Sequence, residues 1–120
     1  NFVIQCGDPD GDGISDPNET TVKGEFSTNG FENNLKHKRG VLGLARSSAA
    51  NSGSSQFYIC HSSAENVVAL DTRYATFGFL VYGYDVLDAI ATVDTNASDK
   101  PTTNVVINSI RFANVPAATN

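Results

Sequence analysis

Ser52-Gly53-Ser54-Ser55-Gln56-Phe57-Tyr58-Ile59-Cys60 is the stretch on which the fold prediction rests. It begins with small, flexible residues and changes abruptly into a strand pattern. Because side chains alternate across a pleated strand, Gln56 and Tyr58 share one face, and we expect the opposite face to be core. A long amide beside a phenol suits a shallow apolar pocket that contains one hydrogen-bonding group. A solvated Gln is the alternative, but the N-terminal stretch Phe2-Val3-Ile4-Gln5 repeats the pairing of an aromatic residue with a Gln.

The composition of the chain limits which classes of protein it can belong to. The chain has 120 residues, of which 40% are hydrophobic, which predicts one globular domain. A net charge of -5 argues against a nucleic-acid partner, which normally requires a basic surface. No apolar run approaches the length of a membrane span, and no signal peptide is evident. The chain begins at Asn1 in a predicted strand and contains no Met, so we expect it to be processed or to belong to a longer protein.

The two cysteines, Cys6 and Cys60, both lie in predicted strands. A free Cys in a strand behaves as a small buried hydrophobic residue, and this is the favoured interpretation of both. A single disulfide between them stays open, because sequence does not give the distance that it requires.

Short strands dominate the predicted secondary structure. Alternating or apolar runs separated by Gly-, Asp- and Ser-rich loops predict strands over 2–6, 21–26, 41–45, 56–61, 75–82 and 105–112. One helix is predicted, over 85–91, and the segment 62–73 is expected to be a loop. This pattern indicates a mainly antiparallel sheet or barrel, with a domain over 1–112 and a C-terminal tail over 113–120.

Ordered motifs along the chain carry a family resemblance. They are Phe2-x-x-Gln5-x-Gly7-Asp8, Gly24-Glu25-Phe26, Leu35-Lys36-His37-x-Arg39-Gly40, Leu44-Ala45-Arg46-Ser47, Ser55-Gln56-Phe57-Tyr58-Ile59, Leu70-Asp71-x-x-Tyr74-Ala75-x-Phe77-Gly78 and Gly83-Tyr84-Asp85-Val86-Leu87-Asp88. In this order they resemble the cyclophilins from Phe2 to about Phe112. Arg46 after Ala45, and Tyr rather than His at position 74, look like the bacterial branch of that family.

The resemblance implies a fold and an activity. The fold is an eight-stranded antiparallel β-barrel with two capping helices. The activity is cis–trans isomerisation of X-Pro bonds in peptides and unfolded proteins. This reaction crosses a barrier of ~18–20 kcal/mol and takes roughly tens of seconds without a catalyst. It requires no cofactor, because the catalyst only has to hold the twisted amide and stabilise its nitrogen lone pair.

The same resemblance assigns roles to individual residues. Phe2 and Tyr58 would form the proline socket, with Leu70 beside them. Gln5 would contact the substrate backbone near the rotating bond. The residues that precede proline would dock on Ala45, the backbone at Arg46, and Gln56, and Tyr74 would close the far side.

The sequence departs from the family in two places. The catalytic arginine of the family would precede Asn1, together with the first strands and the first helix, so we expect part of the domain to be missing from this chain. Arg39, Arg46 and Arg73 match other positions. The Trp that frequently precedes Leu-Asp is Ala69 here, which predicts weak cyclosporin binding.

An acidic loop follows the first strand. Asp8-Pro9-Asp10-Gly11-Asp12-Gly13-Ile14-Ser15-Asp16-Pro17-Asn18-Glu19 fits the spacing of a twelve-residue calcium loop. The candidate ligands are Asp8, Asp10, Asp12, Asp16 and Glu19. A solvated turn is the equal alternative, since the flanking helices of an EF-hand are absent. If calcium binds, we expect it to fasten the loop and to have no part in catalysis.

Three functions remain in consideration: an isomerase, a non-catalytic module for proline-containing peptides, and a calcium-stabilised structural domain. For the isomerase, we expect Gln56→Ala or Tyr58→Ala to abolish most activity with little change in stability. We expect His37 to be a hydrogen-bonded structural residue and His61 to be exposed. The acidic, Met-free composition favours an extracytoplasmic location.

Overall fold

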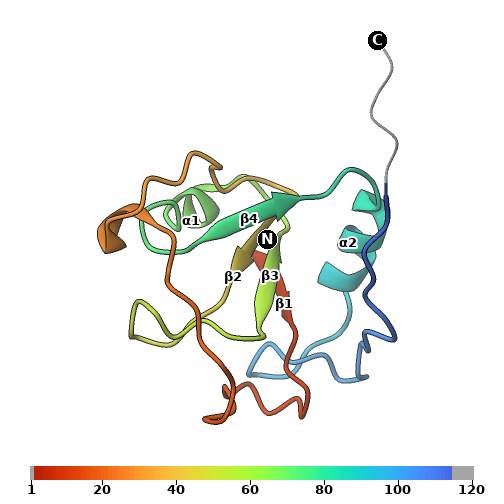
Figure 1. Cartoon of the computed structure of the whole chain (residues 1–120). Helices are drawn as coiled ribbons and strands as arrows, with labels where there is room; N and C mark the ends of the chain where they lie inside the picture. The colour runs from red at the N-terminus through yellow and green to blue at the C-terminus, as the bar shows by residue number, and fades with distance from the viewer. Residues whose placement is uncertain (1, 115–120) are drawn as a thin grey trace.

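A single antiparallel sheet forms the centre of the molecule (Figure 1). The computed structural model describes residues 2–114, so residues 115–120 of the expected tail lie outside the described part. The strands are β1 (Val3–Cys6), β2 (Val41–Leu44), β3 (Phe57–Cys60) and β4 (Thr76–Phe79), in the spatial order β1-β3-β2-β4. The prediction of a mainly antiparallel β fold is confirmed, and the four strands lie within four of the predicted segments.

The register of the sheet places Tyr58 at its centre. Tyr58 lies opposite Gln5 of β1 on one side and opposite Gly43 of β2 on the other. The pairing of β2 with β4 is interrupted between Leu42 and Gly43, where the register shifts. Since directly opposed residues share a face of a sheet, Gln5 and Tyr58 are neighbours on one face.

Two α-helices flank the sheet, and a short 3₁₀ turn lies over Ser27–Asn29. Helix α1 (Glu65–Val68) lies in the segment predicted as a loop, and α2 (Tyr84–Ala91) begins one residue before its predicted start. A four-residue helix is too short for an apolar periodicity to reveal it, which explains why α1 was missed. Figure 1 shows the two helices on opposite sides of the sheet.

Two predicted strands are not strands in the structure. In 21–26 only an isolated bridge forms, between Val22 and Gly53. Residues 105–112 form no strand, and Val106, Ile110 and Phe112 are exposed. A strand requires backbone hydrogen bonds to a neighbour, and within residues 2–114 no sheet edge pairs with this segment. Apolar alternation alone does not reveal whether such a partner is present.

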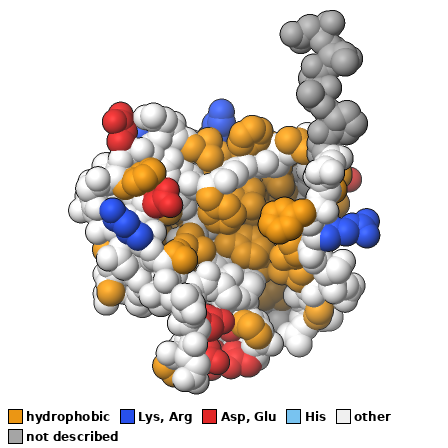
Figure 2. Space-filling model, in the orientation of Figure 1, with side chains coloured by type: hydrophobic (Ala, Val, Ile, Leu, Met, Phe, Trp, Pro, Cys, Tyr) orange, Lys and Arg blue, Asp and Glu red, His pale blue; other side chains and the backbone are white. Residues whose placement is uncertain are grey.

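The deeper core lies on the Tyr58 face of β3. Tyr58 and Cys60 are buried there against Val41 and against Val67 of α1. The opposite face, expected to be core, is only half-buried at Phe57 and Ile59. Exposed hydrophobic side chains also include Phe77 and Phe79 of β4 and Val86 of α2. Figure 2 shows hydrophobic side chains gathered over the face of the molecule on which β4 and α2 lie.

The cysteines do not form a disulfide. Cys6 lies opposite Phe57, whereas Cys60 lies opposite Val3, so the two thiols are at opposite ends of the β1–β3 pair. Three residues of strand separate them, more than a disulfide spans. The prediction of two free thiols is confirmed.

Helix α2 is fastened to the sheet by a charged cluster. Arg39 donates two hydrogen bonds to the carboxylate of Asp88, at 2.6 and 3.0 Å, and its guanidinium lies over the ring of Tyr84. The Nε2 atom of His61 lies 3.0 Å from the same carboxylate. The expectation that His61 is exposed is therefore wrong, since its side chain is only 15% exposed. None of the helices in residues 2–114 is long and apolar enough to cross a membrane.

Candidate active site

Two glutamine side chains join β1 to the start of β3. Gln5 donates from Nε2 to Oε1 of Gln56 over 3.0 Å. Gln56 is only 7% exposed, whereas Gln5 is exposed. The bond leaves the amide nitrogen of Gln56 available as a donor to a substrate carbonyl, since a primary amide offers two N–H groups and two lone pairs.

An apolar cluster lies beside these amides on the same face. Tyr58 is 4% exposed, and its ring meets the ring of Tyr74 edge-on, with centroids 6.2 Å apart. Ala45, Leu70 and Tyr74 are half-buried against the core to which Tyr58 belongs. Four residues that sequence assigned to the substrate site thus lie together.

The structure does not bring Phe2 into this cluster. Phe2 precedes β1 and is 42% exposed, and its carbonyl oxygen accepts a hydrogen bond from the backbone N–H of His61. Val3 is the residue of the N-terminal stretch that packs against the core. Alternation is the signal that could have found Val3, because it shares the strand face of Gln5.

Arg46 links the two loops that border the cluster. Its guanidinium lies over the rings of Phe26 and Tyr74, at 4.9 and 4.7 Å from their centroids. Its Nε and Nη2 atoms donate to the carbonyl oxygen of Arg73, at 3.0 and 2.7 Å. Its Nη1 atom donates to the carbonyl oxygen of Ser47. Every nitrogen of the guanidinium has a partner, so the side chain serves as a wall of the site.

The other two arginines that sequence considered are also engaged. Arg39 binds Asp88, and Arg73 donates to the carbonyl oxygen of Ala69 at 3.2 Å.

His37 contacts the site through the hydroxyl of Tyr58. Its imidazole lies 2.8 Å from Asp71 through Nδ1 and 2.7 Å from the hydroxyl of Tyr58 through Nε2. The prediction of a hydrogen-bonded His37 is confirmed. Sequence placed neither Asp71 nor His37 in contact with Tyr58, because the contact joins residues far apart in the chain.

The described residues also form concave regions away from the Gln5–Gln56 pair. Arg46 lines a small hollow together with Phe26, Leu44 and Ala75, among others. A wider cleft of about 420 Å³ is lined by residues that follow α2, which are Thr92, Val93, Asp94, Thr102, Thr103, Asn104 and Val105. The cleft contains none of the residues assigned to the site, so size alone does not identify the functional surface.

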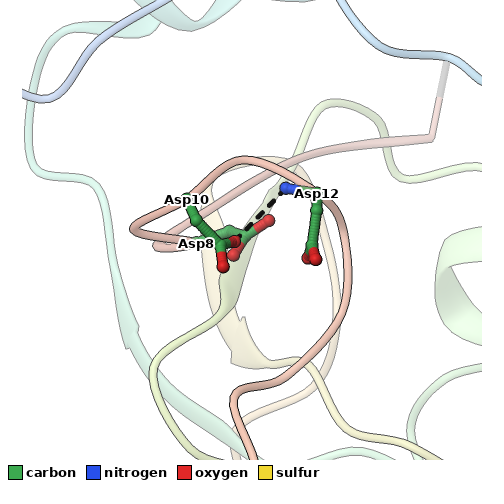
Figure 3. A group of neighbouring side chains, drawn as sticks. All are labelled: Asp8, Asp10 and Asp12. Atoms are coloured by element: carbon green, nitrogen blue, oxygen red, sulfur yellow. Dashed lines mark hydrogen bonds between the residues drawn. The ribbon is translucent and has the colours of Figure 1, made fainter.

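The acidic loop brings three of its five candidate ligands together. Carboxylate oxygens of Asp8, Asp10 and Asp12 lie within 4.8 Å of one another (Figure 3). The backbone N–H of Asp12 bonds the Asp10 carboxylate and lowers the pKa of Asp10. The carboxylate of Asp12, desolvation and the carboxylate of Asp8 together outweigh it, so the pKa is raised. Mutual repulsion of this kind is what a bound cation would relieve.

Asp16 and Glu19 lie outside this group. Asp16 accepts a hydrogen bond from the backbone N–H of Asn18 at 2.8 Å. Glu19 accepts hydrogen bonds from the hydroxyls of Ser54 and Ser55, at 2.6 and 2.8 Å. The far end of the acidic loop is thereby fixed to the segment that leads into Gln56.

Comparison with known families decides the assignment. The sequence profile of the family described as cyclophilin-type peptidyl-prolyl cis-trans isomerase/CLD matches residues 1–112. The chain belongs to the cyclophilin family. This membership confirms the resemblance that the ordered motifs carried.

Individual cyclophilins agree with this assignment. The chain is 31% identical to the Arabidopsis thaliana peptidyl-prolyl cis-trans isomerase CYP18-1, over 98% of this chain and 69% of the relative. It is 36% identical to a peptidyl-prolyl cis-trans isomerase of Acinetobacter baylyi, over 80% of this chain and 50% of the relative. The chain thus spans only part of each relative's length, and its assignment to a bacterial branch stays a prediction.

Solved cyclophilins share the fold. A crystal structure of a cyclophilin-type isomerase from Cryptosporidium parvum matches with a TM-score of 0.78 and 28% identity, covering 96% of this chain and 69% of the other. A crystal structure of the same protein in the presence of the dipeptide Ala-Pro matches with a TM-score of 0.68 and 30% identity, covering 84% and 61%.

Proposed function

We propose that the Tyr58 cluster binds the proline of an X-Pro peptide and that the Gln5–Gln56 pair holds the peptide backbone while the bond rotates. The observation that carries this proposal is the proximity of an apolar cluster to two bonded amides on one sheet face, in a chain of the cyclophilin family. The Ala-Pro dipeptide used with the related Cryptosporidium protein supports proline-containing peptides as the substrate class.

The isomerisation requires no reactive side chain. No covalent bond is broken, so no nucleophile, metal or cofactor is required. The prolyl ring would lie against Tyr58, Leu70 and Tyr74, with Ala45 leaving room for the preceding residue. The unused amide hydrogens of Gln56 would hold the substrate carbonyl as the amide loses planarity. The arginine expected upstream of Asn1 stays a prediction.

Binding of the dipeptide Ala-Pro tests the location of the proposed peptide site. The full protein is titrated with the dipeptide and followed by backbone amide NMR. We expect the largest shifts at Ala45, Gln56, Tyr58 and Tyr74. Shifts that gather instead at residues 92–105 would place binding in the wider cleft and contradict the proposal.

Ala69 bears on inhibitor binding. It replaces the Trp that frequently stands there in the family, and it is exposed beside Leu70. We propose that cyclosporin binds weakly for this reason and that Ala69→Trp strengthens binding, as measured by calorimetry. Equal affinity of the two proteins for cyclosporin would contradict this.

We also propose that the acidic loop binds calcium through Asp8, Asp10 and Asp12. The motif spacing and the close approach of the three carboxylates support this. With Glu19 engaged by serines, we expect a weak site, with Kd on the order of 10⁻⁴–10⁻³ M. Since the pKa of Asp10 is raised, affinity should fall as the pH is lowered through its titration.

Melting temperature and calorimetry test the calcium proposal. Calcium should raise the melting temperature, and a chelator should reverse the change. Asp10→Asn should abolish the effect, whereas Asp99→Asn, which lies outside the loop, should preserve it. Absence of both binding heat and a melting shift would end the proposal.

The composition supports a further proposal, that the protein acts outside the cytoplasm. Its acidic sequence contains no Met, whose thioether is a common target of oxidation, and this suits such a location. Fractionation of the source cells, followed by detection with an antibody, should find the protein in an extracytoplasmic fraction. Recovery in the cytoplasmic fraction alone would contradict it.

A further inference from the structure

A buried chain of hydrogen bonds ends on the hydroxyl of Tyr58. The oxygen Oδ1 of Asp71 accepts from the backbone N–H of His37 at 2.6 Å and lies 2.8 Å from its Nδ1 atom. The Nε2 atom of His37 lies 2.7 Å from the Tyr58 hydroxyl. The three residues come from the loop before β2, from β3 and from the segment after α1.

The chemistry of the partners fixes the direction of these bonds. An ionised carboxylate only accepts, so Nδ1 of His37 carries the proton and donates to Asp71. In the neutral imidazole Nε2 then has a lone pair, and it accepts the hydrogen bond that the Tyr58 hydroxyl donates. The imidazole side chain is 0% exposed, so water does not compete for either nitrogen.

The ring of Tyr58 is held along its length as well as at its hydroxyl. The plane of the His37 imidazole lies within 16° of the plane of this ring, with the two centroids 5.9 Å apart. Tyr74 meets it edge-on. On the β2 side, a Cβ atom at Gly43 would fall on the Tyr58 ring, so the glycine provides the space that the ring occupies.

The hydroxyl is not needed to fill this space. A phenylalanine would occupy the same volume without a buried polar group, whose burial costs free energy unless it is hydrogen-bonded. Here a histidine and an aspartate satisfy it, and both nitrogens of the buried imidazole are used. What the arrangement adds is a fixed tilt of the ring that lies opposite Gln5 and beside Gln56.

We propose that His37, held by Asp71, is a positioning residue for the isomerase reaction: it fixes the Tyr58 ring against which the prolyl ring packs. This rests on the proposed function of the Tyr58 cluster. His37 touches no substrate and acts through Tyr58.

Three variants and one control test the inference in the full protein. Tyr58→Phe removes the hydroxyl and keeps the ring. His37→Asn keeps a donor near the position of Nδ1 for Asp71 but does not reach Tyr58. The third variant combines both changes. Tyr82→Phe is the control, because Tyr82 is exposed and has no part in the proposed site. For each protein kcat/KM on an Ala-Pro test peptide and the melting temperature are measured.

We expect each single variant to lower kcat/KM by about three- to tenfold, the size that loss of one hydrogen bond produces. The double variant should lose no more than the worse single variant, since both changes remove the same bond. Tyr82→Phe should match the wild type. In ¹⁵N NMR of the wild type, His37 should be protonated at Nδ1 and unprotonated at Nε2.

Three results would overturn the inference. Single variants that melt earlier but keep full kcat/KM would make the chain of bonds purely structural. Multiplying losses in the double variant would mean that His37 acts independently of Tyr58. Protonation of Nε2 would reverse the bond direction. Tyr58→Phe preserves the packing of the ring. Its kcat/KM therefore tests the positioning role of His37 even if His37→Asn fails to fold. An inactive wild type would instead overturn the proposed function itself.

Discussion

At the scale of single residues, Gln56 is the side chain most directly open to test. It is buried at the start of β3 and tied to Gln5, so its amide has a defined orientation. Truncation to Ala removes the amide and its hydrogen bond with Gln5. We expect Gln56→Ala to reduce kcat/KM at least tenfold, at a cost of only about 1 kcal/mol in the free energy of unfolding. Peptide assays and urea unfolding check both values, and full activity would contradict the assignment.

Tyr58 requires a different substitution from the one that sequence favoured. Its ring is buried in the core, so Tyr58→Ala should destabilise the protein by roughly 3–5 kcal/mol. The expectation of little change in stability was therefore wrong for this residue, because alternation gives the face of a strand but not the depth of burial. Urea unfolding of Tyr58→Ala beside Tyr58→Phe measures the difference, and equal stability of the two variants would contradict the observed burial.

Cys60 makes stability depend on alkaline pH. Burial, and after it the carboxylate of Asp71, raises the pKa of this thiol to about 11, from a usual value of 9.0. The unfolded chain thus ionises first as the pH rises, so the stabilisation is complete below pH 9.0 and is lost as the pH approaches 11. Between pH 8 and 10, the wild type should lose stability faster than Cys60→Ala does. Parallel curves in urea unfolding would contradict this.

At the scale of elements, two strand glycines make a matched pair. A Cβ atom at Gly43 of β2 would fall on the Tyr58 ring, whereas one at Gly78 of β4 meets no atom within 4 Å. We expect Gly43→Ala to destabilise the protein by about 1–3 kcal/mol and to reduce peptide turnover. Gly78→Ala should have little effect on either. Similar effects of the two substitutions would contradict the packing at the centre of the sheet.

The contact between α2 and the sheet depends on Asp88. The hydrogen bonds from Arg39 are the main cause of the lowered pKa of Asp88, and His61 adds to it. The stabilisation is present above the usual pKa of 3.8 and is lost as the pH falls through the lower pKa of the folded state. Asp88→Asn should therefore melt earlier than the wild type at pH 7, with a smaller difference at low pH. Asp94→Asn is the control. A difference that does not depend on pH would contradict the ion pair.

The sequence predicted the elements whose signals are local. Alternation located β1, β2, β3 and β4, and the apolar face of 85–91 located α2. It failed at 105–112, where a strand-like run finds no sheet edge among the described residues, and at α1, which is too short to show a period. For the site, the family motifs named Ala45, Leu70 and Tyr74, and the structure packs all three against the core that contains Tyr58. The contact of His37 with Asp71 and Tyr58 was not predictable, because it depends on how distant loops meet.

At the scale of the whole molecule, the proposed isomerisation takes place on one face of the sheet. An apolar cluster, two bonded amides and a wall formed by Arg46 lie together, and the chain belongs to the cyclophilin family. Two alternatives are consistent with the same residues: a module that binds proline-containing peptides without turning them over, and a structural domain fastened by calcium. Only catalysis separates the first alternative from the proposal.

Exchange NMR of an Ala-Pro peptide, with the full protein present in catalytic amount, measures that catalysis directly. We expect exchange cross-peaks between the cis and trans forms with the wild type, and their loss with Gln56→Ala. Without enzyme this exchange takes roughly tens of seconds, too slow to produce such peaks. Peptide binding with no cross-peaks at any enzyme concentration would contradict the account and leave the chain a binding module.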